Sequence, residues 1–377
     1  MLKLKFLLLL AAGSIVPFAS AHPDSPAESN PTLEVFFHGV LKEFNIPGLA
    51  VAKVKHNEVL FKGVYGFADI DRGVLVGNDT MFNVASISKP IMGITLLQLV
   101  EQQKLDLDTD INRYLSFRID NPNISKEKIT LRHLASHSSS IDDYYDPDSF
   151  THNKDPEISL ESHLRSLLTP EGKNYQKGHY YLRHQPGQYR KYSNLGAGLA
   201  GALVEATTGI PLAQYSRQTL FNSLHMDHTA WLLQGLNFSD LATPYGISAQ
   251  GEFIAYPHIG NPQYPDGGVR ASISDLSHLM TAILKNTDDD GQKLLTDKLY
   301  AEMFKLQLPK SISTSQRFFW ADNSMGLTGH MGADVGTFAA FYFSVEENSG
   351  IIILMNIDMN EKSTAAMKKI AFKLMEI

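Results

Sequence analysis

Apolar and polar positions alternate near both ends of the chain in a pattern typical of β-strands. Residues 48–71, GLAVAKVKHNEVLFKGVYGFADID, predict two strands joined by a tight turn near His56 and Asn57. Residues 336–358, GTFAAFYFSVEENSGIIILMNID, predict a second hairpin that turns at residues 347–350. We therefore expect strands from both ends of the chain to share one antiparallel sheet.

Helical spacing dominates elsewhere. Residues 32–44 form an apolar-periodic segment stopped by Pro47 and Gly48, and residues 362–377 form an amphipathic closing segment. Further helical patterns, separated by polar loops and without an internal repeat, fill approximately residues 86–300. These patterns predict an α/β (α+β) fold: an antiparallel sheet flanked by helices, with a largely helical inserted region and a ligand-binding cleft between the two parts.

The first 21 residues have the pattern of a secretory signal peptide. A basic start is followed by an apolar run over residues 6–18 and by the small residues Ala19, Ser20 and Ala21. The alternative is a membrane anchor, but this run is short compared with the roughly 20 residues that span a bilayer. We expect cleavage, one domain over residues 32–375 and an exported protein, periplasmic or extracellular.

Composition narrows the class of protein. The 377 residues are 43% hydrophobic, which is ample for a large core, and contain no cysteine, so a disulfide framework and a lipid-modified cysteine are both excluded. Removal of residues 1–21 takes away two lysines and no acid, which changes the formal charge from −7 to −9. This acidity argues against nucleic acid and anionic membranes as partners.

A serine and a lysine stand at the head of an otherwise apolar segment, FNVASISKPIMGITLLQLVEQ. Ser86 and Lys89 are three residues apart, so on a helix they lie on one face. A buried lysine can act as the base that a serine nucleophile needs, because burial disfavours the charged ammonium. The helix N-terminus adds backbone N–H groups for an acyl oxygen that becomes an oxyanion.

The S-x-x-K pattern alone is weak. Ser125 and Lys128 match it by chance in a polar loop, and a lysine in an apolar helix often only packs its stem while its head reaches water. A structural role for Lys89 therefore stays open at this point. The surrounding sequence has to discriminate between the two interpretations.

Two more motifs carry chemistry. In KYSNLGAGLAGALVE, Tyr192 and Asn194 precede a small-residue helix, and a tyrosine near an ammonium shares its proton more easily. In LTGHMGADVGTFAAFYF, His330 can donate to an anionic group, and Gly332 allows a substrate to approach the backbone closely. Each also has a structural interpretation, Tyr192 as a core aromatic residue and His330 as a turn residue. His258 starts another H-x-G, but no strand is predicted directly after it.

Together and in this order, the three motifs resemble the class C β-lactamase and D-alanyl-D-alanine carboxypeptidase family of penicillin-recognising serine hydrolases. The resemblance covers nearly the whole mature chain. Its segments are FNVASISK, QQKLDLDTDINRYL, ITLRHLASHSSSI, SLHMDHTAW, PDGGVRASISDLSHLM and GHMGADVG.

The resemblance implies a role for each motif. Ser86 would form an acyl-enzyme, and Lys89 with Tyr192 would be the general base pair that passes the proton to the leaving group and later activates water. Asn194 would orient Lys89 and the acyl side chain. The backbone N–H groups of Ser86 and Ala333 would form the oxyanion hole.

Three departures from the family pattern bear on the substrate. His330 stands where β-lactamases of this family carry lysine, so we expect any anchoring of a substrate carboxylate to be weaker and pH-dependent. Met331 replaces a small hydroxyl residue often used to bind that carboxylate, and Ser140 replaces a glycine in a turn. We therefore expect an esterase or D-Ala-type peptidase rather than an efficient β-lactamase.

Other functions are less well supported. The pairs His133 with His137 and His225 with His228 have possible metal spacings, but no HExxH glutamate accompanies them, and the acidic run at 288–290 is typical of a solvated turn. We expect no cofactor and a small-molecule or peptidoglycan-derived substrate. The alternative function is a peptidoglycan or penicillin sensor that is non-catalytic or turns over slowly.

Overall fold

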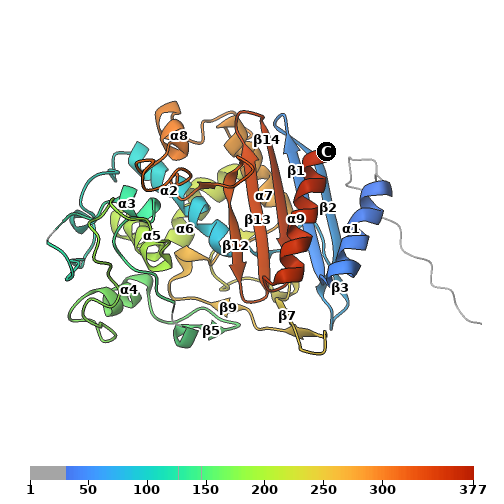
Figure 1. Ribbon diagram of the computed structural model, residues 1–377, viewed down its shortest axis with the longest axis horizontal. Helices are drawn as coiled ribbons and strands as arrows, with labels where there is room; N and C mark the ends of the chain where they lie inside the picture. Colours follow the sequence, from blue (N-terminus) through green and yellow to red (C-terminus); the bar gives the residue numbers. More distant parts are fainter. Residues whose placement is uncertain (1–30, 126, 146) are drawn as a thin grey trace, which may run out of the picture.

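The computed structural model describes residues 31–125, 127–145 and 147–377. The predicted signal peptide lies outside these residues. A seven-stranded antiparallel sheet, in the order β11-β12-β13-β14-β1-β2-β3, forms the centre of the molecule (Figure 1). Its strands are β1 (Gly48–Lys55), β2 (Glu58–Asp69), β3 (Val74–Leu75), β11 (Ala321–Asp322), β12 (Thr328–Asp334), β13 (Thr337–Ser344) and β14 (Ser349–Met355).

Strands from the two ends of the chain pair at the centre of this sheet, as expected. β1 runs antiparallel to β14, from Leu49 opposite Met355 to Lys55 opposite Ser349. The first hairpin turns at His56 and Asn57, as predicted, and both have positive φ, 51° and 68°. The second hairpin turns over residues 345–348, so the predicted turn at 347–350 was placed two residues too late.

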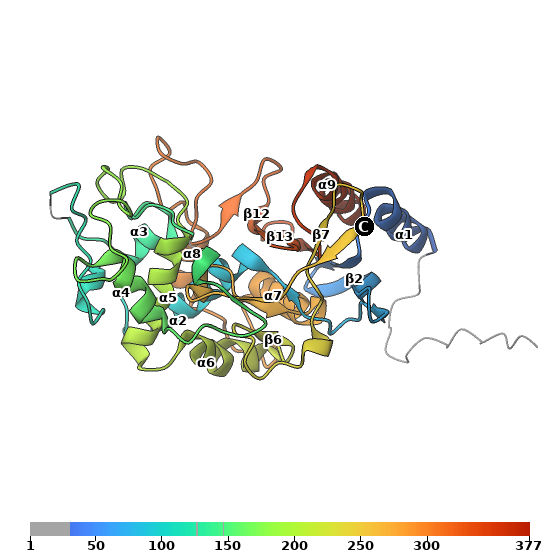
Figure 2. The same cartoon turned by 90° about the horizontal axis from the view of Figure 1, so that it is seen from below.

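Helices cover both faces of the sheet (Figures 1 and 2). α1 (Pro31–Phe44) and α9 (Glu361–Glu376) lie side by side on one face, and α7 (Ile273–Lys285) packs on the other. Phe37 of α1 stacks on Tyr65 of β2, with ring centroids 5.1 Å apart. The amphipathic patterns of the first and last segments therefore identified the helices that bury one side of the sheet.

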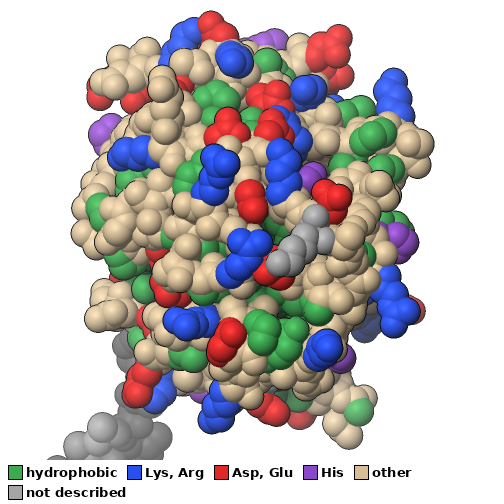
Figure 3. Space-filling model, turned by 90° about the vertical axis from the view of Figure 1, so that its left-hand side faces the viewer, with side chains coloured by type: hydrophobic (Ala, Val, Ile, Leu, Met, Phe, Trp, Pro, Cys, Tyr) green, Lys and Arg blue, Asp and Glu red, His purple; other side chains and the backbone are tan. Residues whose placement is uncertain are grey.

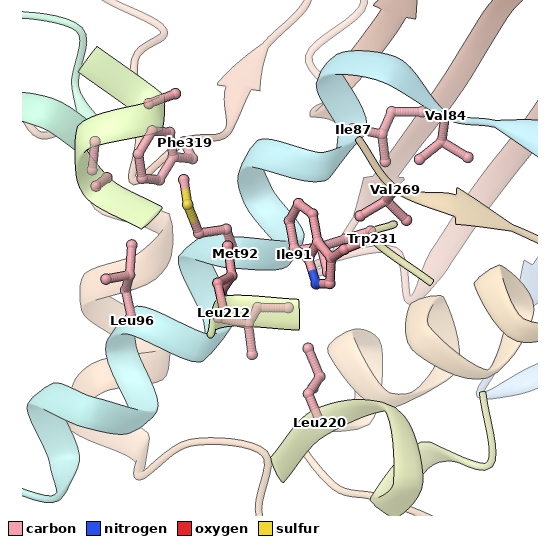
Figure 4. Packing of buried hydrophobic residues seen from close by; sticks show 14 of the residues in the cluster. Val84, Ile87, Ile91, Met92, Leu96, Leu212, Leu220, Trp231, Val269 and Phe319 are labelled. Carbon is pink, nitrogen blue, oxygen red and sulfur yellow. The ribbon is translucent and has the colours of Figure 1, made fainter. Parts of the chain in front are cut away.

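The inserted region forms a second layer of helices beside the sheet. Its α-helices are α2 (Ser88–Glu101), α3 (Leu131–Ala135), α4 (Leu160–Leu168), α5 (Asn194–Thr208), α6 (Leu212–Ser216) and α8 (Asp297–Phe304). Figure 4 shows Ile91, Met92 and Leu96 of α2 within a core that also contains Trp231 and Phe319. α2 is thus enclosed by protein on nearly all sides, which explains why its sequence is apolar all round.

Short elements connect these layers. Small antiparallel sheets are formed by β4 (Phe82–Asn83) with β10 (Arg270–Ala271) and β6 (Thr229–Ala230), by β5 (Thr151–His152) with β9 (Ile259–Gly260), and by β7 (Tyr245–Ile247) with β8 (Phe253–Ala255). Single turns are η1 (Ala85–Ile87), η2 (Ile111–Arg113), η3 (Pro147–Ser149), η4 (Arg217–Phe221), η5 (Asn222–Leu224), η6 (Phe238–Asp240) and η7 (Tyr264–Asp266).

The predicted fold class is confirmed: an antiparallel sheet is flanked by helices, and a largely helical region is inserted between its N-terminal and C-terminal strands. Within the described ranges, no single helix is both long and apolar enough to cross a bilayer. The bent pair formed by residues 194–208 and 212–224, at 77° to each other, meets the length and composition criteria only when taken together.

Candidate active site

Ser86 lies on η1, the single turn that precedes α2. The residue before it, Ala85, has φ of 46°, a left-handed conformation that is costly for a residue with a β-carbon. The side-chain oxygen of Asn83 accepts a hydrogen bond of 2.8 Å from the Ala85 N–H and helps to hold this turn. The turn therefore presents Ser86, partly exposed, at the edge of the buried helix.

Lys89 lies one turn further on and is fully buried, with no exposed surface. Its Nζ is 3.0 Å from Oγ of Ser86, so the predicted pairing of hydroxyl and amine is present in the structure. Nζ also donates to the backbone oxygen of Asp266, at 2.5 Å. The head of Lys89 therefore does not reach bulk water, which argues against the purely structural interpretation of this lysine.

Close packing between α5 and η7 brings Asp266 to Lys89. A β-carbon added at Gly198 would lie 2.5 Å from Gln263, and one added at Gly201 would lie 2.4 Å from Pro265, so larger residues would push η7 away. The Asp266 carboxylate accepts hydrogen bonds from the amides of Asn261, at 2.9 Å, and Gln263, at 2.8 Å. Burial raises the pKa of Asp266 to about 7, and the positive charge of Lys89 opposes part of this rise.

Tyr192 also lies beside Lys89, but the contact is with its ring. Nζ of Lys89 is 4.9 Å from the ring centroid, and the ring of His137 packs 4.3 Å from that of Tyr192. The Tyr192 hydroxyl is buried and has no hydrogen-bond partner within the part of the chain that the structure describes. A buried hydroxyl without a partner beside a nucleophile is a group available to a substrate or a water molecule.

Asn194 forms no hydrogen bond with Lys89 in this structure, so its expected orienting role stays a prediction. Its backbone N–H donates to the Asp143 carboxylate at 2.7 Å, and its side-chain Nδ2 donates to the other oxygen at 3.4 Å. Because Asn194 starts α5, the negative charge of Asp143 is favourable at this helix N-terminus. The backbone oxygen of Asp266, rather than the Asn194 amide, holds Lys89.

His330 lies within β12 and not in a turn, so the structural interpretation of this histidine was wrong. Its Nδ1 donates to the backbone oxygen of Met331 at 2.5 Å, which leaves the other ring nitrogen as an acceptor. Burial by the surrounding protein, together with the nearby charge of Lys89, lowers the pKa of His330 to about 4. Both effects favour a neutral ring at neutral pH and so oppose the expected pH-dependent cation at this position, which stays a prediction.

Gly332 brings β12 against the nucleophile turn. A β-carbon at this residue would lie 2.0 Å from the backbone oxygen of Val84, so only glycine permits this approach. As a result Ser86 and Ala333 line the same cavity of about 290 Å³. The expected oxyanion hole requires these two residues to face one space, and they do.

The two other departures from the family pattern have visible consequences. Ser140 has φ of 64°, the conformation of the glycine that it replaces, and its hydroxyl donates to the backbone oxygen of His184 at 2.5 Å. The turn is therefore kept, at some conformational cost. Met331 is 46% exposed, so its side chain presents an apolar surface where a hydroxyl was expected to bind a carboxylate.

Sequence reasoning missed three polar side chains that line the cavity, those of Asp266, Asp334 and Tyr145. The Tyr145 hydroxyl donates to Oδ1 of Asp334 at 3.0 Å, although the two residues are far apart in sequence. Only Asp266 and Asp334 lay in recognised motifs, PDGG and GHMGADVG, which gave no role to either carboxylate.

The histidine pairs do not build a metal site. His137 follows α3 with φ of 53°, and its Nδ1 accepts a hydrogen bond of 3.3 Å from the Ser193 N–H. Across residues 31–125, 127–145 and 147–377, no group of three or more histidine, aspartate or glutamate side chains has an arrangement that could hold a metal ion.

A serine hydroxyl lies in contact with a buried lysine, on a turn that opens into a cavity at the edge of an antiparallel sheet, and this arrangement can support nucleophilic catalysis by the serine. A family model described as Beta-lactamase matches residues 35–374, and the chain belongs to this family.

Two curated relatives extend this result. Protein flp of Staphylococcus aureus (strain MRSA252) is 23% identical over 333 residues, which are 88% of this chain and 64% of that protein. Esterase EstB of Burkholderia gladioli is 30% identical over 242 residues, which are 61% of this chain and 55% of EstB. The matches thus span less than two thirds of the length of either relative.

Solved structures share the fold at lower sequence identity. FmtA from Staphylococcus aureus has a TM-score of 0.71 at 19% identity, covering 94% of this chain and 92% of FmtA. The octameric penicillin-binding protein homologue from Pyrococcus abyssi has a TM-score of 0.70 at 19% identity, covering 92% of this chain and 78% of that chain.

Proposed function

We propose that this chain is an exported serine hydrolase that acts through an acyl-enzyme on an ester or a D-amino-acid peptide or amide, in preference to a β-lactam. The observation that carries the proposal is the 3.0 Å contact between Ser86 and the fully buried Lys89 at the edge of a cavity. Membership of the Beta-lactamase family and the similarity to an esterase support the same reaction class.

The geometry is compatible with a two-step reaction. Lys89 takes the proton of Ser86 while Oγ attacks the substrate carbonyl, and the N–H groups of Ser86 and Ala333 stabilise the oxyanion. Lys89 and Tyr192 then pass this proton to the leaving group, which departs and leaves an ester on Ser86. A water molecule, activated by the same pair, hydrolyses that ester and restores the free serine.

The preference against β-lactams rests on β12. His330 is neutral at neutral pH and uses its Nδ1 hydrogen on the Met331 oxygen, so it offers neither charge nor a donor to a carboxylate. Met331 adds no hydroxyl. A substrate whose recognition depends on a carboxylate would therefore gain little here, whereas a carboxylate-free ester or amide would lose nothing.

The test compares a p-nitrophenyl ester with a chromogenic cephalosporin. The wild type should hydrolyse the ester with higher kcat/KM than the cephalosporin, and Ser86→Ala should reduce ester hydrolysis by about 10³-fold or more. Ser125→Ala is the matched control, because Ser125 begins the chance S-x-x-K and is exposed, and it should behave as the wild type. Equal activity of wild type and Ser86→Ala would refute the proposal.

The same assay addresses the sensor alternative. Opening of one equivalent of cephalosporin per chain, seen as a colour change, followed by no turnover of either substrate, would favour a slowly deacylating sensor. For export, the N-terminus of the protein recovered from the periplasm or medium should begin at His22, and a protein that retains residues 1–21 would contradict cleavage. A small-molecule or peptidoglycan-derived substrate remains part of this proposal.

A further inference from the structure

Carboxylates gather around the cavity that opens on Ser86. Asp266 and Asp334 line it, and Asp143 lies close enough that its charge, like that of Asp334, helps to raise the pKa of Asp266. The charges of the three carboxylates are opposed there by the buried Lys89. This acidity is local, because basic and acidic side chains are interspersed over the molecular face in Figure 3.

The three carboxylates are not equally available to a ligand. Both oxygens of Asp266 accept hydrogen bonds from side-chain amides, and both oxygens of Asp143 are used by Asn194. Asp334 differs: Oδ1 accepts from the Tyr145 hydroxyl at 3.0 Å and from the Val335 N–H at 2.8 Å. No donor among the described residues contacts its Oδ2, so one oxygen of a half-buried carboxylate is left for a ligand.

The position of Asp334 indicates which part of a substrate it meets. It follows Ala333, whose N–H we assign to the oxyanion hole, so it lies close to the reacting carbonyl. Tyr192, the proposed donor to the leaving group, does not line the cavity, whereas Asn194, Tyr145 and Asp334 do. The cavity is therefore the space for the acyl group, and the leaving group departs on the side of Tyr192.

We propose that Asp334, oriented by Tyr145, is a specificity-determining residue that binds an ammonium group on the acyl part of the substrate. The substrate class is then an aminoacyl ester or amide with a free amine. Two features point to such a ligand: a 290 Å³ cavity that opens on the nucleophile, and a carboxylate within it that Tyr145 and Val335 hold by Oδ1 alone. This inference rests on the proposed function, because it names the substrate of the same site.

The electrostatics of the cavity agree with a cationic ligand. Burial raises the pKa of Asp334, while hydrogen bonds from Val335 and Tyr145 and the charges of Arg270 and Lys89 oppose this rise. An ammonium bound to the carboxylate would oppose it further. A substrate carboxylate in the same space would be repelled by Asp334.

Three benzyl esters with the same leaving group test the inference. Alanine benzyl ester, as each enantiomer, carries an ammonium where benzyl isobutyrate carries a methyl group of similar size, and benzyl hydrogen succinate carries a carboxylate. Release of benzyl alcohol is measured by chromatography at a pH where the amine is protonated. The wild type should show kcat/KM about 10- to 100-fold higher for one alanine ester than for the isobutyrate, as expected for a charged hydrogen bond.

Asp334→Asn removes the charge but keeps a side-chain oxygen for Tyr145 and Val335. It should lose most of the preference for the alanine ester, leave the isobutyrate rate within about twofold, and raise kcat/KM for the succinate ester. A merely structural role would lower all three rates together. Asp289→Asn, at an exposed carboxylate that does not line the cavity, is the control and should keep the wild-type ratios.

The outcomes separate this inference from the proposed function. If hydrolysis depends on Ser86 but the alanine esters have no advantage, or Asp334→Asn lowers all three rates equally, the role of Asp334 is overturned while the hydrolase stands. If Ser86→Ala hydrolyses every ester as fast as the wild type, the proposed function is overturned and this inference with it.

Discussion

Substitution of Gly332 by alanine tests whether the approach of β12 to the nucleophile turn creates the oxyanion hole. Gly332 pairs with Ala339 of β13, and its other side faces η1, where an added β-carbon would lie 2.0 Å from the backbone oxygen of Val84 and 3.3 Å from the β-carbon of Ala85. The first of these atoms belongs to the backbone, and the second is the only side-chain carbon of an alanine. The clash therefore cannot be relieved by rotation of a flexible side chain.

The size of the effect follows from this distance. A β-carbon needs at least about 3 Å to a backbone oxygen, so β12 and η1 must separate by roughly 1 Å, and Ala333 moves with the strand. A displacement of that size at a catalytic group costs about 100-fold in rate. The overpacking itself should lower the free energy of unfolding by about 1–3 kcal/mol.

The assay combines Ser86-dependent ester hydrolysis with urea unfolding, so that the effect of a displaced Ala333 on the rate is separated from a loss of folded protein. Gly77→Ala is the matched control, because a β-carbon there meets no atom nearer than the Thr80 hydroxyl at 3.7 Å. We expect kcat to fall about 100-fold in Gly332→Ala and to remain unchanged in the control. Wild-type kcat in a folded Gly332→Ala would refute the positioning role of this glycine.

Three further predictions concern buried polar groups. Tyr192→Phe removes a buried hydroxyl that has no partner among the described residues. The free energy of unfolding in urea should therefore stay constant or rise by up to about 1 kcal/mol, while kcat for the ester should fall about 100-fold. An unchanged kcat would contradict the role of Tyr192 in proton transfer. Because folding raises the pKa of Asp266 from 3.8 to about 7, its protonation stabilises the wild type at low pH, and this stabilisation is lost as the pH rises through about 7. The unfolding free energy of the wild type relative to Asp266→Asn should therefore decrease, by up to about 4 kcal/mol, between about pH 4 and pH 8. A difference that stays constant over this range would contradict the raised pKa. Because the pKa of His330 is lowered to about 4, kcat/KM for an acidic ester and for a neutral ester should change in parallel between about pH 6 and pH 8. If the two profiles separate near pH 6.5 in the wild type but not in His330→Gln, the His330 ring is a cation below that pH and the lowered pKa is contradicted.

Local patterns predicted the elements well, because each hairpin and each outer helix is encoded by contiguous residues. The turn at His56 and Asn57 and the two outer helices, α1 and α9, lie where their apolar periodicity placed them. The second turn was placed two residues late because Ser349 and Gly350, typical turn residues, extend β14 instead. Their strand conformation is imposed by pairing with β1 and β13, a tertiary effect that no local pattern contains.

The candidate site likewise contains contacts that local sequence predicts and contacts that depend on tertiary packing. The contact between Ser86 and Lys89 follows from spacing on one turn, so it was predictable. The partner of Lys89 was not, because the Asp266 backbone oxygen reaches it only through the packing of η7 against glycines of α5. The neutral state of His330 was also hidden, since it depends on how much protein surrounds the ring rather than on the residue type.

The pairing of β1 with β14 has a consequence for how the molecule is made. Leu49 pairs with Met355, so the centre of the sheet joins residues separated by roughly 300 positions and cannot form until β14 has been synthesised. Until then the facing edges of β1 and β13 lack their shared neighbour and are open to association with other chains. If the chain is exported as proposed, the sheet cannot be completed before β14 is available to join β13 to β1.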